Sequence, residues 1–193
     1  MSEKDEITWR RVKSENGPEL PLFQIRYDWM EHPITRTTLK RLVLESVDWV
    51  NMVARTQSGK LVMVEQYRFG ISANTVETPG GMVDPGETHL QAAQRELLEE
   101  SGYGGGEWHY LGAVEPNPAI HDHLCHHWLA DGVVEVAEPT PGNGEAIRVL
   151  LMDLDQIQVA IEDGRLRHAL ALSALARVYS LWPEHRGTGN PSL

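Results

Sequence analysis

The predicted helix over residues 89–102 constrains this fold more than any other feature, because its two faces need different surroundings. Thr88 followed by Gln91 predicts a capping box at its start, and Gly102 predicts its end. Its apolar stripe predicts packing on a sheet and consists of Leu90, Ala93 and Leu97. Its acidic residues, spaced i, i+3 and i+4, are Glu96, Glu99 and Glu100. We therefore expect a sheet-packed helix that carries three carboxylates along one edge.

These clustered carboxylates repel one another, at a cost of roughly 0.2–0.5 kcal/mol for each close pair. Arg95 lies four residues before Glu99 and is expected to pair with it. A divalent cation would offset the remaining charge, and carboxylate oxygens suit Mg²⁺ or Mn²⁺ better than zinc. The alternative is a solvated acidic helix face that binds nothing.

The residues around the helix follow a fixed pattern from Gly81 to Tyr103. It reads Gly81, five residues, Glu87, seven residues, Arg95-Glu96-Leu97, one residue, Glu99-Glu100, one residue and Gly102-Tyr103. This pattern resembles the signature of the Nudix hydrolase family at every fixed position. The resemblance implies an α+β chain with the Nudix fold, which is an α/β/α sandwich around a mixed sheet. It also implies metal-dependent hydrolysis of a nucleoside diphosphate linked to another group.

Carried over by position, the resemblance also implies a role for each residue of the pattern. The implied ligands of Mg²⁺, or of Mn²⁺ as an alternative, are Glu96, Glu99, Glu100 and the main-chain carbonyl of Gly80. The implied supporting residues are Gly81, Glu87, Arg95 and Gly102. Of these, Arg95 and Glu99 would also belong to the catalytic machinery.

Two further segments resemble the ADP-ribose pyrophosphatase and nucleotide-sugar branch of that family. Residues 64–68 end in Arg68, and residues 77–81 read Glu-Thr-Pro-Gly-Gly. Pro118 lies where this branch carries a proline. We expect Arg68 to bind phosphate, since a guanidinium recognises phosphate oxygens in pairs, or else to pair with Glu65 or Glu77. The implied reaction converts ADP-ribose or a related nucleoside diphosphate sugar to a nucleoside monophosphate and a sugar phosphate.

Glu145 follows a glycine-containing turn, Pro141-Gly142-Asn143-Gly144. The branch often takes its catalytic base from a glutamate in the corresponding loop, and neighbouring glycines would let such a loop close over a substrate. Glu145 is therefore the expected base. Glu99 and Glu100 are the other candidates, and an ordinary exposed loop glutamate is the alternative.

Histidines are concentrated between Pro118 and His127. If this segment is extended, His121, His123 and His127 share one strand face with Cys125, and such ligands suit zinc. Four ligands along a straight strand span roughly 20 Å, however, and cannot converge on one ion. Substrate contact or solvent exposure is the preferred interpretation.

From Ile7 to about Thr56 the chain alternates apolar and polar side chains, with breaks at Gly17-Pro18 and His32-Pro33, which predicts several strands. We divide the chain into a β-rich extension (1–45), a Nudix domain (46–185) and a disordered tail (186–193). So small an extension cannot bury its own core and leaves open strand edges. We therefore expect a homodimer in which the extension, with Trp29 stacking on a base, completes the partner's substrate pocket. In the alternatives, the extension folds back on its own domain and Trp29 is a core residue.

The rest of the chain alternates strand and helix patterns. Residues 57–60 predict a hairpin loop that joins the apolar runs Trp49–Val53 and Leu61–Val64. The second strand is expected to continue to Arg68. Further strands are expected at Trp108–Val114, His126–Ala130 and Ala146–Met152. Closing helices are expected at Leu154–Glu162 and Leu166–Tyr179.

Composition narrows the class of function. The net charge of −11 disfavours nucleic acid and anionic membranes as partners. A single cysteine and the lack of an 18-residue apolar run favour a soluble cytoplasmic protein whose partner is a small nucleoside diphosphate derivative. The alternatives are a dinucleoside polyphosphate or nucleoside triphosphate hydrolase, and a nucleotide sensor without catalysis. The complete set of glutamates argues against the sensor.

Overall fold

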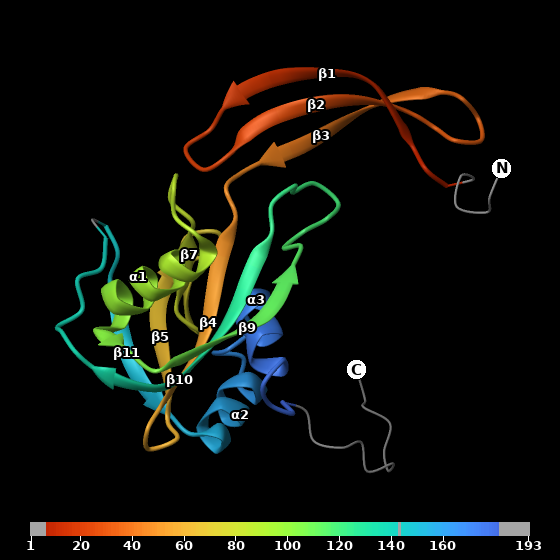
Figure 1. The fold of residues 1–193 in the computed structure, drawn as a ribbon. Coiled ribbons are helices and arrows are strands. Elements are labelled where there is room, and N and C mark those ends of the chain that lie inside the picture. The colour runs from red at the N-terminus through yellow and green to blue at the C-terminus, as the bar shows by residue number, and fades with distance from the viewer. Residues whose placement is uncertain (1–6, 143, 182–193) are drawn as a thin grey trace, which may run out of the picture.

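The computed structural model describes residues 7–142 and 144–181 and contains two separate sheets (Figure 1). The N-terminal sheet is antiparallel and consists of β1 (Arg10–Glu19), β2 (Gln24–Glu31) and β3 (Thr38–Glu45). The predicted β-rich N-terminal region is confirmed, and β2 ends just before His32-Pro33 as expected. The predicted break at Gly17-Pro18 is wrong, because β1 continues through these residues with irregular pairing. As an edge strand, β1 tolerates a proline that donates no hydrogen bond.

The second sheet is mixed and has eight strands. They are β4 (Trp49–Thr56), β5 (Leu61–Arg68), β6 (Ala73–Glu77), β7 (Gly80–Met82), β8 (Tyr103–Gly104), β9 (Glu107–Val114), β10 (Cys125–Glu135) and β11 (Ile147–Met152). The main path runs β11-β5-β4-β10-β8, with β6 on β5, β7 on β4 and β9 on β10. Strand β10 is parallel to β4 and antiparallel to β9. The predicted strands are confirmed. Strands β6 and β7 escaped prediction because Thr78-Pro79-Gly80-Gly81 has the composition of a turn.

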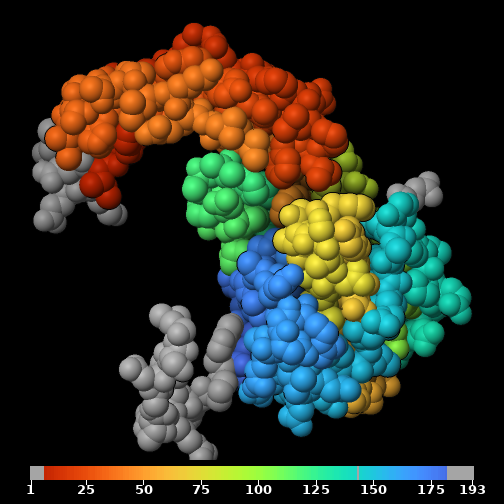
Figure 2. Space-filling view, turned by 180° about the vertical axis from the view of Figure 1, so that it is seen from behind, coloured from red at the N-terminus to blue at the C-terminus, as the bar shows by residue number. Residues whose placement is uncertain are grey.

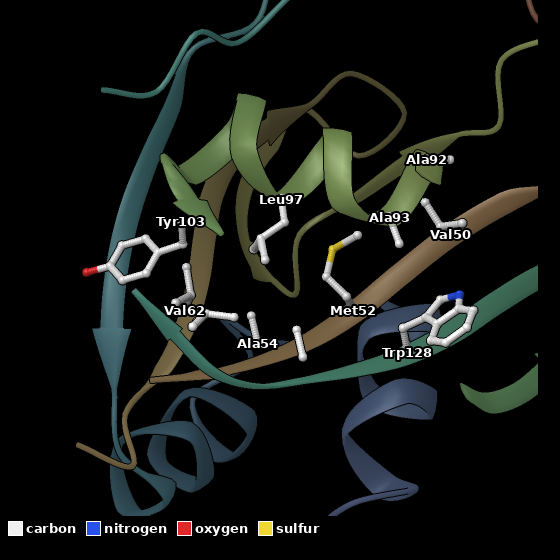
Figure 3. Close-up of a cluster of buried hydrophobic side chains, with 11 residues drawn as sticks. Val50, Met52, Ala54, Val62, Ala92, Ala93, Leu97, Tyr103 and Trp128 are labelled. Carbon is white, nitrogen blue, oxygen red and sulfur yellow. The ribbon is translucent and has the colours of Figure 1, made fainter. Parts of the chain in front are cut away.

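Helices cover both faces of this sheet, which confirms the expected three-layer arrangement. They are α1 (His89–Ser101), α2 (Leu154–Glu162) and α3 (Ala169–Ala176). Successive side chains of a strand point to opposite faces, so Met52 packs toward α1 while its neighbour Val53 packs toward α2 and α3. The cluster under α1, drawn in Figure 3, includes Val50, Met52, Ala93, Leu97 and Trp128.

Helix α3 is shorter than predicted, since it begins at Ala169 rather than Leu166. Gly164 has a φ of 78° and reverses the chain after α2. Leu166 is 1% exposed and donates its main-chain N–H to the carbonyl of Ala160 at 2.7 Å, so its apolar character reflects a buried turn. The predicted disordered tail, residues 186–193, lies outside the described residues.

The N-terminal sheet projects from the body of the molecule as an arm (Figures 1 and 2). Near the base of the arm, Leu44 bridges to His121 and Arg26 pairs with Asp122. In the described part of the chain, no helix has the length and apolar character needed to span a membrane.

Candidate active site

Local sequence fixes both ends of α1. The Thr88 hydroxyl and the Gln91 side chain form the predicted capping box. Gly102 ends the helix with a φ of 74° and donates its N–H to the carbonyl of Leu98 at 2.8 Å. A β-carbon on Gly102 would lie 2.1 Å from the carbonyl oxygen of Ala137. Glycine is therefore required at this position for both conformation and space.

Strand β7 contacts two of the carboxylates of α1 through Gly80 and Gly81. The main-chain N–H of Gly80 donates to Oε2 of Glu100 at 2.9 Å. A β-carbon on Gly81 would lie 2.2 Å from Oε1 of Glu96. A side chain at position 81 would displace that carboxylate, so glycine there leaves Glu96 free to take the position seen in this structure.

Arg95 links four acidic side chains and the main chain of β7. Its Nε and Nη2 donate to the two carboxylate oxygens of Glu87 at 2.9 and 3.0 Å. Its Nη1 donates to Glu96 at 2.8 Å and to Glu99 at 3.1 Å, which confirms the predicted pairing with Glu99. Its Nη2 also reaches the carbonyl of Met82 at 2.9 Å, and Asp84 lies 3.8 Å away. Arg95 therefore holds the loop, the strand and the helix in one arrangement.

The carboxylates behind Arg95 resist ionisation. Burial, together with the charges of Glu96 and Glu145, raises the pKa of Glu100 to about 8. Burial also raises the pKa of Glu96, although the Arg95 guanidinium opposes this effect. A buried acidic cluster of this kind is relieved by a cation. Its donors are carboxylate and carbonyl oxygens, which fit a hard divalent ion.

As arranged here, no three acidic, histidine or cysteine side chains of the described residues are grouped so that they could hold a metal ion. In the α1 cluster, Glu96 and Glu99 are hydrogen-bonded to the Arg95 guanidinium, so their carboxylates are not directed at a common point with Glu100.

Arg68 is held at the end of β5 by a buried carboxylate. Its Nε and Nη2 donate to the two oxygens of Glu77 at 2.8 and 2.6 Å, and Glu77 is 0% exposed. Thr75 also donates to Glu77, and Nδ1 of His168 lies 3.3 Å from it. Although burial opposes its ionisation, the bonds from Arg68 hold the pKa of Glu77 below its usual value. Of the two predicted partners, Glu77 is the correct one, since Glu65 pairs with Arg148.

Glu145 is exposed on the connection between β10 and β11. Its carboxylate accepts a hydrogen bond from the main-chain N–H of Gly142 at 2.9 Å. Its charge contributes to the raised pKa values of Glu96, Glu100 and Arg68. Glu145 and Arg68 are therefore both within electrostatic reach of the carboxylate cluster, although they lie far from α1 in the sequence.

Two predicted site residues, Trp29 and Pro118, have neighbours outside the α1 carboxylate cluster. The ring of Trp29, on β2, is 4.6 Å from Nζ of Lys13 and 5.1 Å from Nζ of Lys40, so its ring neighbours belong to the arm. Pro118 is exposed in the turn that precedes His121.

The histidine segment does not form one strand face. Strand β10 begins at Cys125, so His121 and His123 lie before it. Their rings stack on each other at 5.0 Å, and Phe23 stacks on His121 at 5.4 Å. His127 is fully buried within the sheet. The shared strand face is therefore wrong for His121 and His123, because the strand begins only at Cys125. The expected solvent exposure is wrong for His123 and His127, because both side chains are buried.

Sequence analysis did not identify three residues that contact the site. Thr75 could have been found, since it shares a strand face with Glu77. His168 reaches Glu77 from the start of α3, and Asn51 reaches the turn before Gly80 from β4. Neither contact has a local sequence signal.

Comparison with known proteins places this chain in a family. Residues 47–174 match the model of the NUDIX domain. The methanol dehydrogenase activator of Bacillus methanolicus is 29% identical over 159 residues, which cover 81% of this chain and 85% of that protein. The ADP-ribose pyrophosphatase of Mycobacterium tuberculosis is 31% identical over 147 residues, which cover 76% of this chain and 69% of that protein.

A solved structure shows the shared fold. The crystal structure of ADP compounds hydrolase superposes with a TM-score of 0.75 at 22% identity, covering 88% of this chain and 91% of that one. The fold, the complete motif and the match of the domain model over most of the chain agree, and this protein belongs to the Nudix hydrolase family.

Proposed function

We propose that this Nudix hydrolase cleaves the pyrophosphate bond of ADP-ribose or a related nucleoside diphosphate sugar in the cytoplasm. The products would be a nucleoside monophosphate and a sugar phosphate. Relatives named ADP-ribose pyrophosphatase and ADP-sugar pyrophosphatase support this substrate class. The observation that carries the proposal is the acidic cluster of α1 within electrostatic reach of Arg68, whose guanidinium is fixed by Glu77, because a pyrophosphate bound with a cation needs both kinds of group.

The family's enzymes generally require a divalent metal ion, and we propose Mg²⁺, with Mn²⁺ as the alternative. Its ligands would be Glu96, Glu99, Glu100 and the carbonyl of Gly80. When bound, the ion supplies the positive charge that reconciles an anionic pyrophosphate with an acidic pocket. Glu96 and Glu99 must then exchange their bonds to Arg95, while Glu87 keeps that guanidinium in place.

Arg68 binds the phosphate groups in this proposal. Its Nε and Nη2 are committed to Glu77, so the face it shows to Glu100 and Glu145 is already oriented. Thr75 and His168 support Glu77 in turn.

Glu145 takes the proton of the attacking water. Its exposed carboxylate and its electrostatic coupling to Glu96 and Glu100 support this role. Glu99 and Glu100 are the alternative bases. Glu145→Gln should lower kcat with little change in KM or metal affinity, because the base acts on the water rather than on the bound ground state. Glu138→Gln, on the same connection, is the control and should keep wild-type kcat.

We also propose a homodimer in which the arm of one subunit delivers Trp29 to the substrate of the other. The apolar side chains exposed on the arm and its turns support this, and include Val12, Leu20, Leu22, Ile34, Leu39 and Leu42. Lys13 and Lys40 beside the ring add positive charge that suits a nucleotide.

A substrate panel tests the proposed function. Purified protein with Mg²⁺ is assayed against ADP-ribose, ADP-glucose, GDP-mannose, UDP-glucose, diadenosine polyphosphates and nucleoside triphosphates, with products identified chromatographically. We expect ADP-ribose or another diphosphate sugar to give the highest kcat/KM. Preferred hydrolysis of polyphosphates or triphosphates would overturn the substrate class, and nucleotide binding without turnover would indicate the sensor.

A further inference from the structure

Asn51 is a polar residue in the middle of a buried apolar strand. Its side chain is 6% exposed, and its neighbours Val50 and Met52 are 1% and 0% exposed. Burying an amide without hydrogen-bond partners costs about 1–3 kcal/mol in proteins, so its partners explain its place in β4. Strand alternation puts Asn51 on the sheet face opposite α1.

The amide nitrogen of Asn51 points at the turn between β6 and β7. Its Nδ2 lies 3.5 Å from the carbonyl oxygen of Thr78, 3.3 Å from Oγ1 of Thr78 and 3.3 Å from the carbonyl oxygen of Pro79. The main-chain N–H of Met52 also donates to the Pro79 carbonyl, at 3.0 Å. Strand β4 thus supplies donors to both buried carbonyls that precede Gly80.

Gly80 packs directly against Asn51. A β-carbon on Gly80 would lie 2.4 Å from Nδ2 of Asn51 and 2.3 Å from the carbonyl oxygen of Val50. Pro79 has no N–H and Gly80 has no side chain, so neither residue can position this peptide by itself. The contacts with β4 position it, and its N–H then meets Glu100.

A buried polar chain behind Asn51 fixes which way its amide faces. Sγ of Cys125 donates to Oδ1 of Asn51 at 3.4 Å and lies 4.0 Å from Nδ1 of His127. Nε2 of His127 lies 3.2 Å from Oγ of Ser173 on α3. Burial lowers the pKa of His127 to about 4, so the ring is neutral at pH 7. With Oδ1 facing the thiol, the NH₂ group of Asn51 must face the turn.

We propose that Asn51 is a positioning residue that holds the Thr78–Gly80 turn, so that the carbonyl of Gly80 and the carboxylate of Glu100 meet the same divalent cation. This inference rests on the ligand roles proposed for Gly80 and Glu100. Asn51 lies on the sheet face that is turned away from α1, so it acts on the cation site only through the Gly80 peptide. Its loss should therefore loosen one ligand of the cation while Arg68 and the arm stay unchanged.

The test uses the full-length protein and Mn²⁺ alone, with free Mn²⁺ measured by electron paramagnetic resonance. Asn51→Leu keeps the size of the side chain and removes its donors, whereas Asn51→Ser keeps one smaller donor. Changes in residues that position metal ligands typically cost about 10–100-fold in metal affinity. We expect Asn51→Leu to weaken Mn²⁺ binding by about 10-fold or more and Asn51→Ser to give a smaller loss. At a fixed, subsaturating metal concentration kcat should fall, while KM for ADP-ribose stays within about threefold.

Val53→Ala is the matched control, because Val53 is buried on β4 and on the same sheet face as Asn51 but takes no part in the polar chain. It should lower the melting temperature without changing Mn²⁺ affinity, which separates positioning from general stability. Wild-type Mn²⁺ affinity in folded Asn51→Leu would overturn the proposal, and Asn51→Ser decides in the same way if the leucine variant does not fold. If Mn²⁺ binding depends on Asn51 but ADP-ribose is not cleaved, the positioning role stands and the proposed function fails. If the wild-type protein cleaves ADP-ribose and the Asn51 variants match it in every readout, the proposed function stands and the positioning role fails.

Discussion

The two sheets of this molecule differ in how much of their surface is buried. The eight-stranded sheet is covered on both faces by helices, and most residues of its strands β4 and β5 are buried. In the described part of the arm, the side chain most removed from solvent is the carboxylate of Asp28, bonded to Ser14 and Arg26. The body therefore folds around apolar side chains. The arm depends instead on strand pairing, on ion pairs and on contacts with a neighbouring surface such as the proposed second subunit.

This difference separates two kinds of functional residue. In the body, packing fixes Glu96, Glu100 and Arg68 relative to one another before any ligand arrives. In the arm, the cationic neighbours of the Trp29 ring, Lys13 and Lys40, belong to the arm itself. We therefore expect changes in the body to affect catalysis and stability, and changes in the arm to affect association and substrate affinity.

The largest expected effect is on catalysis. Glu96→Gln and Glu100→Gln should each lower kcat by at least about 10²-fold with the fold retained, because each removes a proposed ligand and its charge. Glu31→Gln, on the arm, should keep wild-type kcat and serves as the control. Steady-state kinetics at saturating Mg²⁺ measure this difference, and near-wild-type turnover in either site variant contradicts the assignment.

The next effect is on stability and compares two leucines. Leu97 is 0% exposed under α1, so Leu97→Ala should lower the free energy of unfolding by about 2–5 kcal/mol. Leu42 is 39% exposed on the arm of a single subunit, so Leu42→Ala should lower the unfolding free energy by less than Leu97→Ala does, even where the proposed dimer covers this side chain. Urea denaturation at one protein concentration measures both values. Equal losses would mean that the arm is as tightly packed as the body.

Removing residues 1–44 tests the arm directly. We expect a folded monomer with weakened substrate binding, because the body keeps its core while the partner's pocket loses Trp29. Light scattering gives the mass, and KM for ADP-ribose gives the affinity. If the full-length protein is already monomeric at micromolar concentration, the dimer proposal fails.

The smallest effect concerns pH and the metal-free protein. The pKa of Glu100, about 8, lies above the value near 4.5 that this carboxyl has when unfolded. The folded state therefore binds the proton more tightly, and the stability gained from it is present below pH 4.5 and lost as the pH rises toward 8. The melting temperature without metal should fall over this range, and Glu100→Gln should make the decline shallower. A decline of unchanged slope in that variant would show that another group is responsible.

The sequence predicted those parts of the fold and site that depend on near neighbours. The capping box, the end of α1 and the bond between Arg95 and Glu99 all join residues within a few positions of each other. Contacts that cross between elements were not predictable in this way. The bond from Gly80 to Glu100 depends on how β7 meets α1, and the bond from Asn51 to Pro79 depends on strand register.

The errors have the same physical origin. Leu166 has the spacing of a helix residue, but Gly164 turns the chain and tertiary packing buries Leu166 in a loop. β1 passes through Gly17-Pro18 because it lies at a sheet edge, which the sequence does not reveal. The roles of Glu145, Trp29 and Pro118 remain predictions for the same reason, since each depends on a substrate or a second subunit.

The guanidinium of Arg95 has a consequence for how the protein is made. A newly synthesised chain carries its own counter-ion for Glu96 and Glu99, so the motif can close before any divalent ion is available. If Glu96 and Glu99 bind the ion as proposed, metal loading replaces their bonds to Arg95 in a site that already has its shape. It then requires two hydrogen bonds to open and the ion to lose bound water, but it does not require the motif to refold.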